Sequence, residues 1–100
     1  MDHWQRPLPY VITPKSGPLP QMLSLIDANR ALGLLPRGYL RRAHWLRAGH
    51  ALVTAAKTGG SRDIEWAFEA LVAALDKEGW LTAVSITQPP GSAGQEWRHF

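Results

Sequence analysis

The segment Ser61–Gly79 constrains the fold most, because its sequence, SRDIEWAFEALVAALDKEG, has the pattern of a helix with one apolar side. At about 100° per residue, the large apolar side chains fall on one face and most charged ones on the other. This pattern is typical of a helix that covers a hydrophobic core. Ser61 is placed to cap the first turn, and Gly79 can adopt the left-handed conformation that ends helices. The predicted buried side consists of Ile64, Ala67, Phe68, Leu71, Val72, Ala74 and Leu75.

Two apolar segments before this helix predict a β-hairpin. Leu8–Thr13 and Leu19–Leu23 flank the turn-forming segment Pro14–Pro18. The first segment is rich in β-branched and aromatic residues, and the prolines near its start favour an edge position there. A hairpin alone is not stable in water, so we expect it to pack on the helices.

Two further helices are expected between the hairpin and the organising helix. Ser24 and Asp27 form the pattern of a capping box at the start of a short helix, which continues to about Leu35. A longer helix is expected from about Tyr39 to Lys57, where a pair of glycines ends it. Its apolar side is predicted to contain Trp45, Leu46, Gly49, Leu52, Val53 and Ala56, with another element close to Gly49.

These elements predict one α+β domain, a hairpin packed on three helices, over residues 1–82. One hundred residues suffice for a single modest core. Residues 83–100 are assigned to a largely disordered C-terminal tail because they are rich in Pro, Gly and Ser, although Ala83–Thr87 has the composition of a short strand. The N-terminal arm, Met1–Arg6, is expected to be loosely held.

Composition narrows the class of protein. The chain has no cysteine, which excludes disulfides and thiolate metal sites. It has no apolar segment of membrane-spanning length and no signal-peptide pattern at its start, so we expect a cytoplasmic protein that does not act in a membrane. No residue pattern predicts a catalytic, cofactor or metal site. His44 and His50, for example, lie about 120° apart on the expected helix. We therefore expect no cofactor and no enzyme activity.

The chain resembles a family of small bacterial domains of unknown function, the family numbered 982. The similarity covers about Trp4–Leu81 and consists mostly of helix-capping and helix-packing positions. It implies an α+β fold with a hairpin and three helices, and it supplies no catalytic residues. The matching residues are Ser24, Asp27, Ala28, Tyr39, Ala43, Ala51, Leu52, Ala67, Phe68, Ala70 and Gly79.

Trp66 is the strongest candidate for a binding residue, because it falls on the polar side of the Ser61–Gly79 helix. An exposed tryptophan is common at protein interfaces. Together with Ala70, Ala73 and Lys77 it defines a candidate interface, most simply with a second copy of the chain. The competing interpretation is that the hairpin, the N-terminal arm or the tail covers Trp66. The preferred function is therefore a protein-interaction module that forms a homodimer.

A basic surface supports a different function. Arg37, Arg41, His44 and Arg47 fall on the polar side of the second expected helix, and the net charge is +3. Such a face could follow the phosphates of a nucleic acid. An ordinary solvated helix face has the same composition. A nucleic-acid-binding module is thus the alternative to protein binding.

Overall fold

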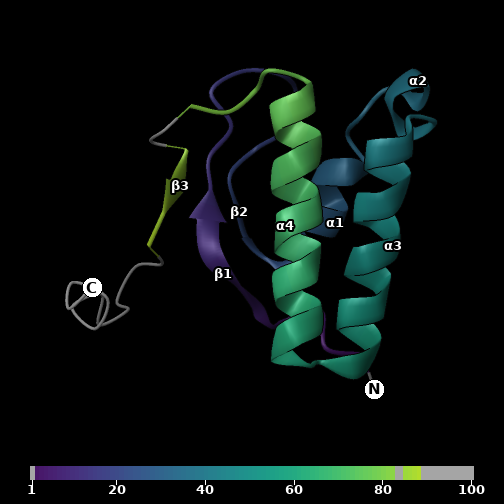
Figure 1. Ribbon diagram of the computed structural model, residues 1–100, viewed down its shortest axis with the longest axis vertical. Coiled ribbons are helices and arrows are strands. Elements are labelled where there is room, and N and C mark those ends of the chain that lie inside the picture. Colours follow the sequence, from purple (N-terminus) through teal and green to yellow (C-terminus); the bar gives the residue numbers. More distant parts are fainter. Residues whose placement is uncertain (1, 83–84, 89–100) are drawn as a thin grey trace.

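The computed structural model describes residues 2–82 and 85–88, which form an α+β fold as the sequence predicts. In chain order the elements are β1 (Pro7–Ile12), β2 (Met22–Ser24), α1 (Leu25–Leu32), α2 (Arg37–Leu40), α3 (Ala43–Thr58), α4 (Ser61–Lys77) and β3 (Ile86–Thr87). Figure 1 shows α3 and α4 side by side, with the strands on the flank of α4 that faces away from α3. The short helix α2 precedes the first turn of α3.

The strands form an antiparallel sheet in the order β2-β1-β3. The β1–β2 pair confirms the predicted hairpin, although β2 begins at Met22 and not at Leu19. β3 confirms the short C-terminal strand, because Ile86 pairs with Ile12 at the end of β1. Within the described residues, the start of β1 therefore has the predicted edge position on the β3 side, while its end is central.

The folded unit extends past the predicted boundary at residue 82. Ser85 is only 2% exposed, and its carbonyl accepts a hydrogen bond of 2.7 Å from the backbone of Thr13. Residues 85–88 thus belong to the domain and not to a tail. The other residues of the predicted tail, 83–84 and 89–100, lie outside the described residues.

The N-terminal arm is held in place, contrary to the prediction. The carbonyls of Trp4 and Arg6 accept hydrogen bonds of 3.0 Å from the backbone N–H groups of Ile26 and Leu25, respectively. These groups lie in the first turn of α1, where helical N–H groups have no partner within the helix. The indole of Trp4 packs against the core. The arm therefore completes the start of α1.

Side chains complete the same turn, and they confirm Ser24 as its cap. The Ser24 hydroxyl accepts a hydrogen bond from the backbone of Asp27 at 3.3 Å. The Asp27 carboxylate in turn accepts from the backbone of Leu23 at 3.1 Å. In a standard capping box the acid returns to the cap residue itself. Here it reaches one residue further back, and helix α1 ends at Leu32, three residues before the predicted Leu35.

The second expected helix is divided, and its buried side is not the predicted one. α2 ends at Leu40 and α3 begins at Ala43, with Arg42 in an extended conformation between them. Trp45 and Leu52 are buried as expected, whereas Leu46 is 60% exposed and Val53 is 41% exposed. The buried side is rotated toward α4 because alanines form much of it. Its members are Trp45, Ala48, Ala51, Leu52, Ala55 and Ala56.

Small side chains also form the side of α4 that accompanies α3. Ala67, Ala70 and Ala74 are all buried. Alanines on both helices let their backbones approach closely, because a methyl group needs little space between them. Ala70 therefore belongs to the core. Its predicted place on an exposed interface is wrong, because α3 covers the position that the isolated helix would leave open.

Both ends of α4 are defined, one of them differently from the prediction. Gly60, not Ser61, is the N-cap residue, and no side chain caps this end of the helix. At the other end, Gly79 has the expected positive φ of 76°. The N–H groups of Gly79 and Trp80 donate to the carbonyls of Asp76 and Leu75, respectively. This pair of bonds is a Schellman motif, which explains why the helix stops here.

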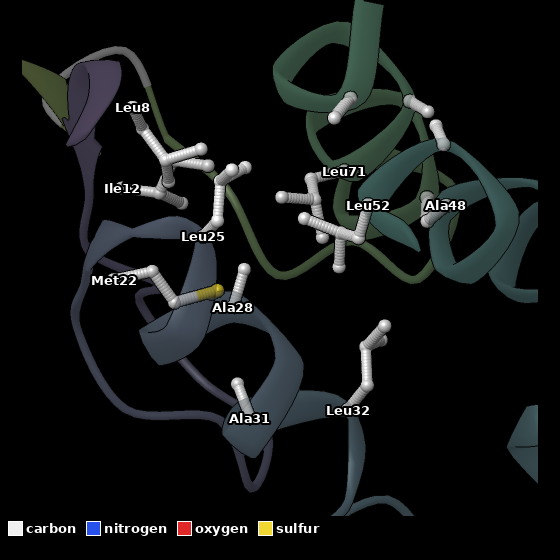
Figure 2. Close-up of a cluster of buried hydrophobic side chains, with 14 of the residues drawn as sticks. Leu8, Ile12, Met22, Leu25, Ala28, Ala31, Leu32, Ala48, Leu52 and Leu71 are labelled. Carbon is white, nitrogen blue, oxygen red and sulfur yellow. The ribbon is translucent and has the colours of Figure 1, made fainter. Parts of the chain in front are cut away.

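The hydrophobic core lies where the sheet, α1, α3 and α4 meet. Figure 2 shows Leu8 and Ile12 of β1 and Leu25 of α1 on one side, with Leu52 and Leu71 across from them. Leu71 is fully buried, as the apolar pattern of α4 predicts. Phe68 and Val72 are only partly buried at the edge of this core.

Candidate functional site

The predicted basic surface is not one continuous helix face. Arg37 lies in α2 and Arg41 is its C-terminal cap residue, whereas Arg47 lies in α3, beyond the break. These three arginines are exposed. His44 is different, because its side chain is only 19% exposed and its Nε2 atom lies 3.0 Å from a carboxylate oxygen of Glu78. His44 therefore contributes to an internal contact.

The carboxylate of Glu78 is the centre of the best-defined polar cluster. It lies just after α4, and its side chain is 8% exposed. One Nη atom of Arg42 donates to both carboxylate oxygens, at 2.7 and 2.8 Å. The indole N–H of Trp45 donates to the same carboxylate at 2.9 Å. Together with His44, these donors satisfy the carboxylate from three sides and join the start of α3 to the end of α4.

Two opposing influences set the pKa of Glu78. Burial removes water from the carboxylate and by itself raises its pKa. The hydrogen bonds from His44, Trp45 and Arg42, with the positive charge of Arg42, act in the opposite direction. Their combined effect is larger, and the pKa of Glu78 lies below its ordinary value of 4.5. Glu78 is therefore an anion at neutral pH, with the role of a structural clamp.

Aromatic rings close the cluster toward the hairpin. The ring of Trp80 lies 5.4 Å from that of Tyr39 and 6.0 Å from that of Trp45, measured between ring centres. The guanidinium of Arg42 lies 4.4 Å from the centre of the Tyr39 ring. Gly17 lies against the indole of Trp80, where an added Cβ would be 2.6 Å from a ring carbon. The hairpin loop thus depends on a glycine that leaves room for Trp80.

The sequence analysis missed Glu78 as the centre of this cluster and placed Arg42 wrongly, beside the apolar side of a longer helix. The reason is distance along the chain, because Arg42 and Glu78 are 36 residues apart. One signal was available. A carboxylate at the C-terminal end of a helix opposes the helix dipole, so such a glutamate implies a compensating cation.

Trp66 remains the most exposed aromatic residue of α4, as the sequence predicts. It is 42% exposed, and its ring meets the edge of the His50 ring at 6.5 Å between centres. Ala73 and Lys77 lie further along the same side of α4 and are exposed. Of the four residues in the predicted interface, three are therefore available at the surface, and Ala70 is not.

A groove of about 440 Å³ lies where α1, α2 and α3 meet. Its exposed apolar residues are Leu46 and Val53 of α3 and Leu40 of α2. Gly49 lies between them on α3. An added Cβ at this position would meet only a methyl group of Leu32, at 3.9 Å. No other element of the described chain lies close to Gly49, so the predicted close approach is wrong. The groove is lined by Asn29, Leu32, Leu40, Trp45, Leu46, Gly49, His50 and Val53.

Two searches for other kinds of site gave negative results within residues 2–82 and 85–88. In this part of the chain, no three histidine or acidic side chains gather closely enough to hold a metal ion. No helix there has both the length and the apolar character needed to cross a membrane.

Comparison of the chain with protein-family models, with curated proteins and with solved structures finds no match. The resemblance to the bacterial family numbered 982 therefore stays a prediction, and the surfaces of this molecule carry the functional argument.

Proposed function

We propose that this protein is a non-enzymatic interaction module that forms a homodimer through the exposed side of α4. The exposure of Trp66 carries the proposal. Tryptophan presents a large apolar surface, and leaving nearly half of it in water is unfavourable unless a partner covers it. The helix already has a buried face without Trp66, so packing of the core does not require this residue.

The charges beside Trp66 support a two-fold contact between copies. Arg62 and Glu69 are exposed residues of α4, one on each side of Trp66 along the helix. In an antiparallel contact centred beside Trp66, Arg62 of one copy faces Glu69 of the other, and the pair occurs twice. Ala73 adds little bulk further along this surface. A self-complementary surface of this kind favours a second copy over an unrelated partner.

Substitution of Trp66 by glutamate tests this proposal. We expect wild-type protein at tens of micromolar to sediment as a dimer and Trp66→Glu to sediment as a folded monomer. Its free energy of unfolding at high dilution should change by less than about 0.5 kcal/mol, because the side chain is exposed in the monomer. Large destabilisation of the diluted variant would mean that the chain itself covers Trp66, and a wild-type monomer would refute the proposal.

Reversal of the two charges tests the arrangement more sharply. Arg62→Glu and Glu69→Arg are each expected to weaken the dimer about tenfold or more, since each places like charges together twice. The double variant Arg62→Glu/Glu69→Arg should recover most of the wild-type dimer affinity, because the exchange restores both pairs. Equal weakening in the single and double variants would exclude this two-fold contact.

Nucleic-acid binding is the second candidate, because Arg37, Arg41 and Arg47 are exposed. We expect these arginines to give only weak binding of duplex DNA that is lost between about 50 and 200 mM salt, as for other mildly basic surfaces. Titration of labelled duplexes of several sequences at both salt concentrations measures this. Sequence-selective, nanomolar binding at about 150 mM salt would instead favour the nucleic-acid function.

A further inference from the structure

Charge is distributed unevenly along this chain. No carboxylate occurs between Asp27 and Asp63, a segment that contains all of α2 and α3 and most of α1. The same segment contains seven cationic residues, which are Arg30, Arg37, Arg41, Arg42, Arg47, Lys57 and Arg62. The helices that line the groove therefore have one carboxylate among them, that of Asp27, which accepts a hydrogen bond from the backbone of Leu23.

Most of these cations have no internal carboxylate to neutralise them. Arg42 is the exception, since it forms the ion pair with Glu78. Arg30, Arg41 and Arg47 are exposed, and each is next in sequence to a residue that lines the groove. Lys57 is exposed one helical turn after Val53. An apolar groove thus lies among cations, in a region where nearby carboxylates do not cancel their charge.

The floor of the groove is open at Gly49. A glycine on a helix surface removes the side chain that would otherwise keep another backbone at a distance. It also lowers helix stability by about 1 kcal/mol relative to alanine. Within the described chain nothing uses this space, because an added Cβ would touch only Leu32. Leu46 and Val53 flank this position one turn before and one turn after it, and both are exposed.

From these observations we infer that the groove of α1, α2 and α3 binds an acidic amphipathic helix of another protein. Apolar side chains spaced three and four residues apart on that helix would contact Leu40, Leu46 and Val53. Its backbone would pass close to Gly49, and its Asp and Glu side chains would face Arg41, Arg47 and Lys57. The exposed leucine and valine surface is unsuited to a phosphate backbone, which makes nucleic acid the poorer occupant of this groove.

Designed peptides provide the probe. The first is a blocked, fluorescently labelled helix of about 14 residues with leucines on one face and glutamates elsewhere. The second has lysine in place of every glutamate, and the third has the composition of the first but no continuous leucine face. Fluorescence anisotropy at about 150 mM salt should show that the first peptide binds at least about tenfold more tightly than either control, since charge and apolar contacts both contribute. Equal binding of the lysine peptide or of the scrambled peptide would overturn the inference, and so would absence of binding.

Gly49 offers a matched pair of protein variants. Gly49→Leu is expected to fill the groove and to weaken binding of the acidic peptide about tenfold or more. Gly49→Ala is the control, because its methyl group fits beside Leu32 and leaves most of the groove open. Both variants should keep or increase the melting temperature, since each removes a glycine from the middle of α3. Equal peptide affinity in the two variants would refute the groove as the binding site.

Two further measurements distinguish a peptide in the groove from a peptide on the α4 surface and from a membrane in the groove. Trp66→Glu should bind the peptide with wild-type affinity, whereas Gly49→Leu should keep the wild-type dimer. Loss of peptide binding in Trp66→Glu would overturn the inference and assign the peptide to the α4 surface. Vesicles of neutral and anionic phospholipid test a membrane surface as the occupant. Binding to the anionic vesicles that Gly49→Leu abolishes, without binding of the peptide, would also overturn it.

Discussion

Replacing Leu71 with alanine is expected to lower the free energy of unfolding by about 2–5 kcal/mol. Leu71 is fully buried where α4 meets the rest of the core, so its removal leaves a cavity in addition to the lost apolar burial. A domain of this size has a total stability of about 5–15 kcal/mol, so the loss is a large share of it. Urea denaturation followed by far-UV circular dichroism measures the change.

Leu46→Ala is the matched control, because it makes the same chemical change in an exposed residue of α3. Its effect should stay within about 0.5 kcal/mol. If the two variants lost similar stability, Leu46 would be buried in solution, and the position of the groove beside α3 would be wrong.

Replacing Glu78 with glutamine is expected to cost about 2–3 kcal/mol. The amide cannot balance the charge of Arg42, and its NH2 group places donors beside the donors of Arg42 and Trp45. The half-exposed side chain of Arg42 can turn toward water, so the cost stays below that of a fully buried ion pair. Denaturation at pH 7 measures the difference, and a change below about 0.5 kcal/mol would show that the cluster does not hold α3 to α4.

Acid should remove the same stabilisation in the wild-type protein. The pKa of Glu78 is lower in the folded state than its ordinary value of 4.5. Its contribution is therefore complete above about pH 4.5 and is lost as the pH falls through the lower, folded-state pKa. The stability difference between wild type and Glu78→Gln should accordingly shrink below pH 4.5. A difference that stays constant down to pH 2 would contradict the assignment of the charged carboxylate.

Local patterns in the sequence predicted those parts of the fold that depend on local structure. The apolar repeat of α4 identified Leu71 as buried, and Ser24 and Gly79 marked helix ends because caps involve neighbouring residues. The buried side of α3 could not be predicted in the same way. Large apolar residues such as Leu46 dominate a hydrophobic pattern, but the alanines of α3 are the residues that α4 covers. Which side a helix buries depends on the shape of its neighbour.

The candidate surfaces were predicted unevenly for the same reason. Trp66 is exposed as expected, since its position on an amphipathic helix places it away from the core. Ala70 is buried because a second helix lies beside it, which the pattern of one helix does not reveal. The pairing of Glu78 with Arg42 and the docking of the N-terminal arm on α1 join residues far apart in the chain. Neither has a periodic signal.

The order of strands in the sheet has a consequence for how this chain folds. β1 lies in the middle of the sheet, yet it is synthesised first, and its partner β3 is made more than seventy residues later. Closing so long a loop is slow compared with forming neighbouring helices, so α3 and α4 can associate well before the sheet is complete. Until Ile86 and Thr87 arrive, the outer edge of β1 is open to pairing with another chain. In this period the nascent protein is most exposed to aggregation, and the last strand closes that edge.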